Sequence, residues 1–278
     1  MTFITRFAPS PTGPLHLGHA YSAIIAHDMA RRVGGKFYVR IEDLDQSRSK
    51  KKWENQIFDD LDWLGLSWDG PVVRQSEQID RYKNILMRFI KELSLFECNC
   101  SRRDIKNALS APHESEKLSG PDGIIYPGTC RGNMFSSQSK FENVLRMHIN
   151  SGENKSFSFC ELGPREGEIS FSSEEFSKTV GDVVLWRKEY PAYHLACVAD
   201  DSEQNITHVV RGLDLFEATK IHTLLNSLLG FKKPYYYHHR LICDENGRRL
   251  AKRHDSKSIF KYRQEGLKAN DVRALIGF

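Results

Sequence analysis

The chain has 278 residues, of which 40% are hydrophobic, so it can bury a sizeable core, and its composition argues against disorder. The net charge of +4 suits a polyanionic partner such as nucleic acid, although many ordinary soluble proteins carry a similar charge. The amino terminus lacks the regions of a signal peptide, and no apolar run is long enough to span a bilayer. We therefore expect no membrane partner and a cytoplasmic location, where the six cysteines are reduced.

The first forty residues predict a βαβ unit. The expected elements are a buried strand over 3–8, a proline-rich loop over 9–14, a helix over 17–33 and a strand over 36–41. Parallel strands bind ligands at their carboxyl ends. We therefore expect residues 6–19 and 42–45 to lie together at that edge of the sheet.

Beyond this unit the pattern changes twice. Apolar spacing predicts helices over 53–66 and 77–96, and a polar segment from 97 to about 177 predicts an insertion with a mobile loop over 110–123. Further apolar runs are assigned to the second half of a nucleotide-binding sheet, at 182–186, 193–199, 207–210 and 215–229. A hairpin signal at Asn246-Gly247 precedes a basic segment and a helical tail.

Two histidines mark the start of the first predicted helix. His16 and His19 lie three residues apart, so both imidazoles can project toward the exposed amides of the helix end, where phosphate binds well. Gly18 between them permits close approach of an adenine or ribose to the backbone. An isolated pair of this kind is more often two surface histidines, so its neighbours decide the interpretation.

Those neighbours carry a family resemblance. Arg6-Phe7-Ala8-Pro9-Ser10-Pro11-Thr12-Gly13, followed by His16-Leu17-Gly18-His19, closely resembles the signature of glutamyl-type class I aminoacyl-tRNA synthetases. In that family the histidines bind ATP and stabilise charge on the α-phosphate while the amino-acid carboxylate attacks. The resemblance implies that His16 and His19 are catalytic and that Gly18 lies in the ATP site.

A second signature of that family is a Lys-Met-Ser-Lys-Ser loop. The corresponding segment is Arg249-Leu250-Ala251-Lys252-Arg253, in which only Lys252 matches strictly and Ala251 lacks a hydroxyl. The resemblance implies that this loop binds ATP and that Lys252, with Arg253, stabilises the triphosphate. A basic turn alone would be interpreted as a solvated surface.

A site for an acidic amino acid needs cations for its side-chain carboxylate and an anion for its ammonium group. Arg6 and Arg211 resemble the family's carboxylate ligands, Glu42 its ammonium ligand, and Tyr193 a tyrosine that contacts glutamate. A neutral amide would leave Arg211 poorly compensated, which favours glutamate over glutamine. The resemblance implies a glutamate site made of Arg6, Phe7, Ala8, Pro9, Ser10, Glu42, Tyr193 and Arg211.

Each of these residues has a structural alternative. Arg40 and Glu42 could form an ordinary surface ion pair, and Tyr193 could simply pack in the sheet. Cys197 departs from the family pattern, which commonly has asparagine at that position. The order and spacing of the candidate glutamate-site residues along the chain favour the functional interpretation.

Several cysteines match a metal-binding insertion found in part of this family. The resemblance implies one structural Zn²⁺ held by Cys98, Cys100, Tyr126 and Cys130. Tyrosine is an unusual ligand, so His113 or water competes for the fourth position, and three free cysteines are the structural alternative. The remaining cysteines are predicted to be small core residues, namely Cys160, Cys197 and Cys243.

The resemblance covers essentially the whole chain, yet no room is left for the family's anticodon-reading domain of roughly 100 residues or more. The chain is therefore similar to a truncated bacterial branch, the glutamyl-Q tRNA(Asp) synthetases. The resemblance implies ATP-dependent, tRNA-independent activation of L-glutamate, with Mg²⁺ accompanying ATP, and transfer to queuosine in tRNA(Asp) by a monomer. The alternatives are a minimal enzyme that charges the 3′ end of tRNA(Glu) and a non-catalytic RNA-binding paralogue.

We accordingly expect an α/β fold of the class I synthetase type. It combines a Rossmann-like parallel sheet with an inserted zinc-binding, acceptor-type subdomain and a short helical carboxyl-terminal segment. The predicted divisions are the first catalytic half over 1–96, the insertion over 97–177, the second catalytic half over 178–240, and the Lys252 loop with its helical tail over 241–278.

Overall fold

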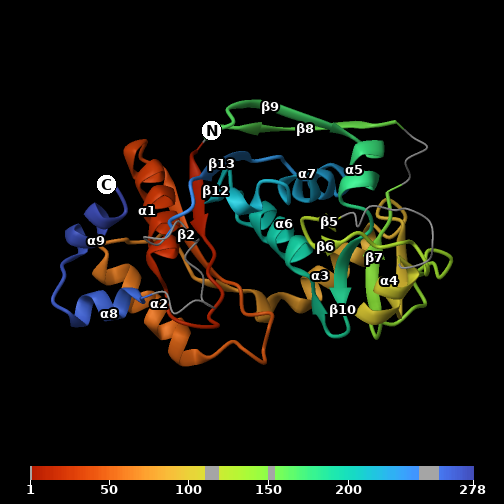
Figure 1. The fold of residues 1–278 in the computed structure, drawn as a ribbon, viewed down its shortest axis with the longest axis horizontal. Helices are drawn as coiled ribbons and strands as arrows, with labels where there is room; N and C mark the ends of the chain where they lie inside the picture. The colour runs from red at the N-terminus through yellow and green to blue at the C-terminus, as the bar shows by residue number, and fades with distance from the viewer. Residues whose placement is uncertain (1, 110–118, 150–153, 244–256) are drawn as a thin grey trace.

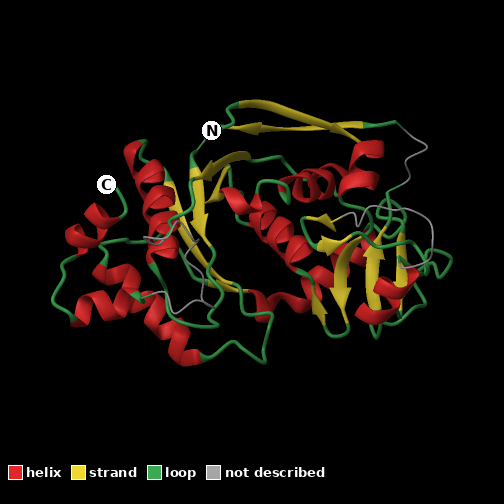
Figure 2. Ribbon diagram, in the orientation of Figure 1, coloured by secondary structure: helices red, strands yellow, loops and turns green. Residues whose placement is uncertain are grey.

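The computed structural model describes residues 2–109, 119–149, 154–243 and 257–278 (Figure 1). Within those ranges the chain contains both helices and strands, and the helices flank several small sheets (Figure 2). No helix in the described part is long and apolar enough to cross a membrane. The predicted hairpin at Asn246-Gly247 and most of the predicted loop over 110–123 lie outside the described residues.

The amino-terminal βαβ unit is confirmed. It consists of β1 (Ile4–Phe7), α1 (Leu17–Arg32) and β2 (Lys36–Ile41), and the short strand β3 (Val73–Arg74) extends its parallel sheet. Gly34, with φ of 65°, ends the helix, and a Cβ on Gly35 would lie 2.3 Å from the carbonyl oxygen of Phe3. The glycine pair therefore lets the chain turn closely past the start of β1.

The next two predicted helices are shorter than expected. They are α2 (Lys51–Trp63) and α3 (Ile79–Arg88), the latter preceded by the 3₁₀ turn η1 (Gln75–Gln78). The prediction of a helix over 77–96 is wrong beyond Arg88, because β4 (Leu95–Cys98) follows. Leu95 and Phe96 are both buried, and β4 pairs with another strand, so its backbone hydrogen bonds are made in a sheet.

The following segment contributes strands to three different sheets. Its elements are α4 (Arg102–Ala108), β5 (Ser119–Gly120), β6 (Gly123–Ile124), β7 (Val144–Met147), β8 (Ser156–Glu161), β9 (Gly167–Ser172), α5 (Ser173–Thr179), β10 (Val183–Arg187) and β11 (Tyr190–Pro191). An antiparallel sheet has the order β11-β10-β7-β4. The assignment of residues 182–186 to the nucleotide-binding sheet is therefore wrong. Strand β10 is antiparallel to β7 and is joined to β11 by a tight turn.

The elements after β11 include a strand that packs against the amino-terminal βαβ unit. They are α6 (Tyr193–Glu203), β12 (His208–Gly212), η2 (Leu213–Leu215), α7 (Thr219–Leu228), β13 (Tyr235–His239), α8 (Ile259–Gln264) and α9 (Ala269–Leu275). Beside β12, the amide of Thr207 donates to the carbonyl of Ile4 at 3.0 Å, so β12 lies along β1. The tail helices lie beside α1 and α2 in Figure 1, where Arg273 contacts Asp28 at 3.0 Å.

Strand pairing crosses the predicted boundary at residue 177 in both directions. Strand β10 joins the sheet of β4 and β7, whereas β8 pairs in parallel with β13 and antiparallel with β9. Figure 1 shows β8 and β9 as a long hairpin along the top of the molecule. The division into four domains remains a prediction.

A buried cluster of charged side chains joins α6 to the strands β1 and β2. Asp201 on α6 receives hydrogen bonds from Arg6 Nε on β1 at 3.0 Å and from Arg40 Nη1 on β2 at 2.7 Å. All three residues are less than 9% exposed. Burial alone would raise the pKa of Asp201, but the adjacent charges of Arg6 and Arg40 outweigh burial and lower that pKa to about 2. The carboxylate therefore stays ionised and paired.

We predict that Asp201→Asn destabilises the protein, because it leaves two buried guanidinium groups without their shared anion. The free energy of unfolding should fall by about 3–5 kcal/mol, measured by chemical denaturation. Asp45→Asn is the matched control, since the Asp45–Arg48 pair lies at the surface and should leave unfolding nearly unchanged. Equal stability of Asp201→Asn and the parent chain would contradict this account.

Candidate active site

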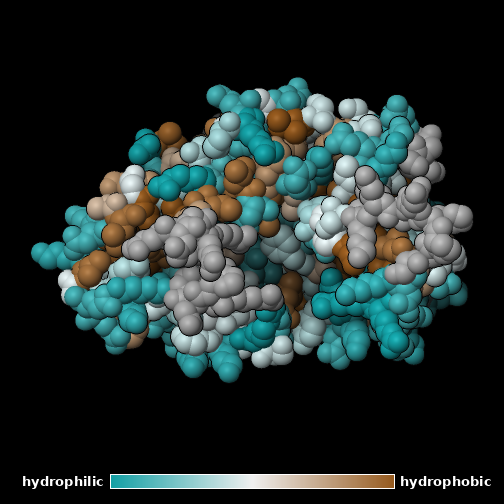
Figure 3. Space-filling view, viewed as in Figure 1, coloured by the Kyte–Doolittle hydropathy of each residue, from teal (hydrophilic) through white to brown (hydrophobic). Residues whose placement is uncertain are grey.

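A cavity of about 400 Å³ opens where β1, β2 and β12 end at their carboxyl ends. The surface in Figure 3 is mostly hydrophilic on this face and is hollowed near its centre. Every residue predicted to bind glutamate lines the cavity, namely Arg6, Phe7, Ala8, Pro9, Ser10, Glu42, Tyr193 and Arg211. His16, Gly18 and His19 line it as well. The structure thus brings these predicted residues together, while their roles stay predictions.

The predicted ATP loop lies outside the described residues. Its members are Arg249, Leu250, Ala251, Lys252 and Arg253. The cavity also has polar residues that the sequence analysis missed, among them Ser22 and His239. Ser22 Oγ lies 2.6 Å from His239 Nε2. Ser22 follows His19 by one helical turn, a spacing that would have indicated a shared face.

The two histidines of the signature cap their own helix. The amide of Gly18 donates to Nδ1 of His16 at 3.1 Å, and the amide of His16 donates to Nδ1 of His19 at 3.2 Å. Both Nδ1 atoms are acceptors, so each neutral ring carries its proton on Nε2. The two rings lie with their centroids 3.7 Å apart and their planes tilted by 31°. They are thus ordered as hydrogen-bond donors beside the cavity.

The local structure explains why residue 18 is a glycine. A Cβ at this position would lie 3.0 Å from Cε1 and 3.2 Å from Nδ1 of His16. The amides at this helix start were expected to be open, but the amide of Gly18 is already bound by the His16 ring. That ring can fold back over the helix start only because residue 18 has no side chain. This constraint exists whether or not a nucleotide also approaches Gly18.

The two arginines of the cavity differ in their partners. Arg6 makes a two-pronged contact with Asp201, with Nε at 3.0 Å and Nη2 at 3.2 Å. Arg211 is also buried, yet within the described residues it has no carboxylate partner and contacts His222, His238 and a threonine hydroxyl. Arg211 is therefore the cation whose charge stays available to an incoming carboxylate.

Glu42 follows β2 and lines the same cavity. Its Oε1 lies 3.4 Å from Nη2 of Arg40, whose side chain is fully buried, so this is not a surface ion pair. Burial raises the pKa of Glu42 to about 7, against the opposing charges of Arg40 and Arg6. Without a further cation, the Glu42 carboxyl group is poised to gain or lose a proton near neutrality.

Tyr193 and Cys197 complete this part of the site from α6. Tyr193 lines the cavity from the first residue of the helix, not from a strand. Cys197 stands where the family commonly has asparagine, and its Sγ lies 3.7 Å from Arg6 and 3.8 Å from Arg40. Burial raises the pKa of Cys197 to about 12, so the group stays a neutral thiol between two cations.

A second cavity, of about 590 Å³, adjoins the first. The two share Ser10, Glu42 and Tyr193, and the second extends to Arg187 and Tyr190 near β10 and β11. A molecule lying there would have direct access to a group bound between Glu42 and Tyr193. The fold thus provides room for a second reactant beside the first.

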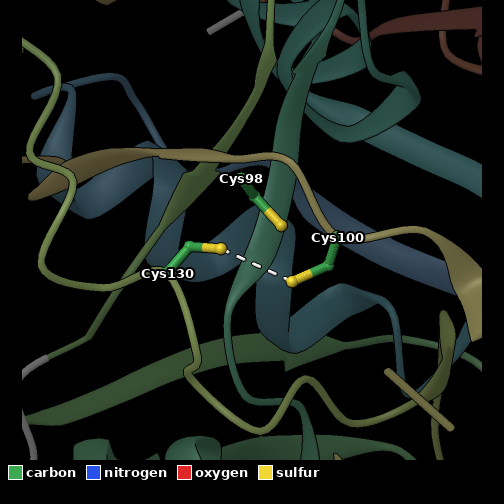
Figure 4. Close-up of side chains that lie close together, drawn as sticks. All are labelled: Cys98, Cys100 and Cys130. Carbon is green, nitrogen blue, oxygen red and sulfur yellow. Dashed lines mark hydrogen bonds between the residues drawn. The ribbon is translucent and has the colours of Figure 1, made fainter. Parts of the chain in front are cut away.

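Three of the predicted metal ligands converge (Figure 4). Ligand atoms of Cys98, Cys100 and Cys130 all lie within 4.8 Å of one another, and Tyr126 Oη lies 3.4 Å from Cys100 Sγ. Zn–S bonds of about 2.3 Å in a tetrahedron place sulfurs about 3.8 Å apart, so these side chains fit Zn²⁺. His113, the alternative ligand, lies outside the described residues.

The remaining cysteines are only partly as predicted. Cys197 is buried, but Cys160 is half-buried and Cys243 is exposed. The prediction that all three are core residues is therefore wrong for the last two. Cys160 lies on the hairpin strand β8, and Cys243 follows β13 at the edge of the described chain.

Comparisons with known proteins agree with this geometry. A family model described as "tRNA synthetases class I (E and Q), catalytic domain" matches residues 2–276. A protein of Rhodobacter capsulatus named glutamyl-Q tRNA(Asp) synthetase is 52% identical over 99% of both chains. One of that name from Geobacter sulfurreducens is 37% identical over 92% of this chain and 77% of its own.

A solved structure gives the same fold. The glutamate tRNA ligase of Elizabethkingia meningosepticum, in complex with its amino acid, matches with a TM-score of 0.78 and 26% identity. The match covers all of this chain and 61% of that one, so this chain spans about three-fifths of its length. With the cavity and the family match in agreement, the chain belongs to the glutamyl and glutaminyl class I tRNA synthetases, of which it carries the catalytic domain.

Proposed function

We propose that this protein activates L-glutamate with ATP, without tRNA, and transfers the glutamyl group to the queuosine base of tRNA(Asp). The observation that carries the proposal is the 52% identity, over 99% of both chains, to a protein named for that activity. Because the substrates are ATP and tRNA, we expect the enzyme to work in the cytoplasm. That it is a monomer is a separate part of the proposal.

The charges around the cavity support glutamate as the amino acid. Arg211 supplies a buried positive charge for the side-chain carboxylate, with Arg6 on the neighbouring strand, and Glu42 supplies an anion for the ammonium group. Glutamine would place a neutral amide against Arg211 and leave the cation uncompensated. The hydroxyl of Tyr193 and the Phe7–Ser10 segment are proposed as the remaining contacts.

The adenylation step requires the α-carboxylate of glutamate to attack the α-phosphate of ATP while pyrophosphate leaves. We assign His16 and His19 to charge stabilisation, because both rings present Nε2–H as a donor from a fixed helix start. Lys252 and Arg253 are proposed to contact the leaving phosphates. ATP would enter as its Mg²⁺ complex, in which the cation offsets part of the phosphate charge.

The acceptor is proposed to enter through the second cavity. That cavity reaches Glu42 and Tyr193, so a hydroxyl lying in it can approach the activated carbonyl carbon. The hydroxyl oxygen then attacks that carbon, the bond between the carbonyl carbon and the phosphate oxygen breaks, and AMP leaves. The hydroxyl proton passes to an oxygen of the departing phosphate. Arg187, exposed at the far end of the cavity, can neutralise a nearby phosphate of the tRNA.

A labelled-glutamate assay tests the proposal. Purified protein with ATP and Mg²⁺ should catalyse glutamate-dependent exchange of pyrophosphate into ATP in the absence of tRNA. Label should then appear on tRNA(Asp) that contains queuosine and stay absent from queuosine-free tRNA. Periodate oxidation of the 3′ end should leave the transfer intact.

The alternatives give different results in the same assay. Loss of label after periodate oxidation would indicate a minimal enzyme that charges the 3′ end. Absence of pyrophosphate exchange would indicate a non-catalytic RNA-binding paralogue. Exchange that requires tRNA would reject tRNA-independent activation.

The pKa of Glu42 predicts how glutamate binding depends on pH. Only the ionised carboxylate attracts the ammonium group, and its pKa is raised to about 7. The ionised fraction therefore falls as the pH falls, and affinity for glutamate should be about tenfold weaker at pH 6 than at pH 8. Isothermal titration calorimetry without ATP measures this directly.

Glu42→Gln is the control for that dependence. This variant should bind glutamate weakly, with the same affinity at pH 6 and pH 8, because the titrating group is gone. A slope that persists in the variant would assign the pH dependence to another group.

We further propose that Cys98, Cys100 and Cys130 hold one structural Zn²⁺, with Tyr126 as the fourth ligand. The fit of the side chains supports this assignment. The ion would fasten α4 and β4 to the loop that carries Cys130. The cluster packs against Phe96 and Val144, so we expect the ion to stabilise chiefly the sheet formed by β4 and β7.

We expect elemental analysis to find one zinc per chain and removal of it to lower the thermal stability of the protein. Cys130→Ser should show both effects, since one of three thiolates is lost. Cys243→Ser is the matched control, because that cysteine is exposed and outside the cluster. Normal folding of the protein without any bound zinc would disprove the assignment.

A further inference from the structure

Arg211 sits at the centre of a chain of side-chain hydrogen bonds that the assigned chemistry does not use. We call this chain the histidine relay. In order of contact it consists of Asp122, His194, His222, Arg211, His238 and Glu161. Every member except Asp122 is at most 5% exposed. Such a buried, continuous network calls for a physical reason.

One arm of the relay runs toward α7 and α6. Arg211 Nη1 lies 3.2 Å from His222 Nδ1, and His222 Nε2 lies 3.0 Å from His194 Nδ1. Arginine can only donate, so Nδ1 of His222 accepts and its proton is on Nε2. The same logic puts the proton of His194 on Nε2, which donates to Asp122 Oδ1 at 2.9 Å.

The other arm runs toward β13 and β8. Arg211 Nε donates to His238 Nε2 at 3.1 Å, so the proton of His238 is on Nδ1. That nitrogen donates to Glu161 Oε2 at 2.5 Å. The second carboxylate oxygen of Glu161 accepts the amides of His238 at 2.9 Å and Gly163 at 2.8 Å, so this end of the relay is fixed by the backbone.

Among the residues that the structure describes, the relay gives Arg211 neutral hydrogen-bond partners and no carboxylate. Neutral imidazoles accept its N–H groups without cancelling its charge, whereas a directly paired carboxylate, like that of Asp201 beside Arg6, would compete with a substrate carboxylate. Burial lowers the pKa of His222, and Arg211 lowers it further. Burial likewise lowers the pKa of His238 against the opposing effect of Glu161. Both rings therefore stay neutral around pH 7.

Resting on the glutamate-activating function above, we propose that the histidine relay orients Arg211 and thereby sets the preference for glutamate over glutamine. His222 and His238 are positioning residues in this role, since they act through Arg211. Both terminal carboxylates belong to the segment over 97–177, so that segment contributes to amino-acid selection through Asp122 and Glu161.

The protonation of the rings tests the relay itself. ¹⁵N NMR of the histidine-labelled, otherwise unmodified protein should show the proton of His222 and His194 on Nε2 and that of His238 on Nδ1. Resonances are assigned with His→Asn variants. The opposite tautomer at His222 or His238 would overturn the proposal.

Substitution tests the consequence for selectivity. His222→Leu removes the acceptor for Arg211 Nη1 and should raise the KM for glutamate about tenfold, since a buried donor is left unpaired. The KM for ATP should stay unchanged. The ratio of kcat/KM for glutamate to that for glutamine, measured by pyrophosphate exchange, should fall. His222→Asn returns an acceptor near the Nδ1 position and should recover most of the loss.

Two further variants make the outcome decisive. His27→Leu is the matched control, because His27 pairs with Asp28 outside the cavity and should leave the glutamate-to-glutamine ratio unchanged. Asp122→Ala addresses the case in which His222→Leu does not fold, since the Asp122 side chain is 54% exposed. This variant should lower the ratio by a smaller factor.

An unchanged ratio in folded His222→Leu, or in Asp122→Ala if the former does not fold, would overturn the proposal. Failure of the parent protein to exchange pyrophosphate with glutamate would instead reject the proposed function. In that case the tautomer measurement still decides whether the relay exists.

Discussion

The structure depends on the burial of ionised side chains where α6 meets the strands β1 and β2. Asp201 lies between Arg6 and Arg40 and so connects α6 to the strands β1 and β2. Taking these groups out of water costs free energy, and only close pairing recovers it. Electrostatics therefore fixes the geometry of this side of the cavity, because displacing either arginine would remove one of the two cations paired with Asp201.

The same constraint distinguishes Arg6 from Arg211, which the sequence analysis treated as equivalent carboxylate ligands. Arg6 is held by an internal anion, whereas Arg211 is held by neutral acceptors. The cavity thus combines Arg6, whose charge is balanced by Asp201, with Arg211, whose described partners are neutral. Glu42 completes the pattern, because burial among these charges shifts its pKa to the neutral range. On the proposed function, selectivity for an acidic ligand would follow from how each charge is compensated, not from how many charges are present.

Much of this site could be predicted from the sequence because its residues follow short motifs. Those between Arg6 and His19 lie on one strand, loop and helix start, so local order determines their positions. The relay could not be predicted. Its members come from separate strands, helices and the turn between β5 and β6, and the hydrogen bonds between Asp122 and His194 depend on tertiary packing. The extended helix prediction beyond Arg88 failed similarly, because burial of Leu95 and Phe96 in a sheet overrides apolar spacing.

Strand β8 has a consequence for how this chain can vary during evolution. It is encoded within the polar middle segment, yet it pairs with β13, and its last residue, Glu161, anchors the backbone of His238. The middle segment is therefore no removable module. A lineage that deleted it would lose two strands from the sheet beneath the cavity, so we expect insertions and deletions to accumulate in its loops, while the β8–β9 hairpin keeps its length.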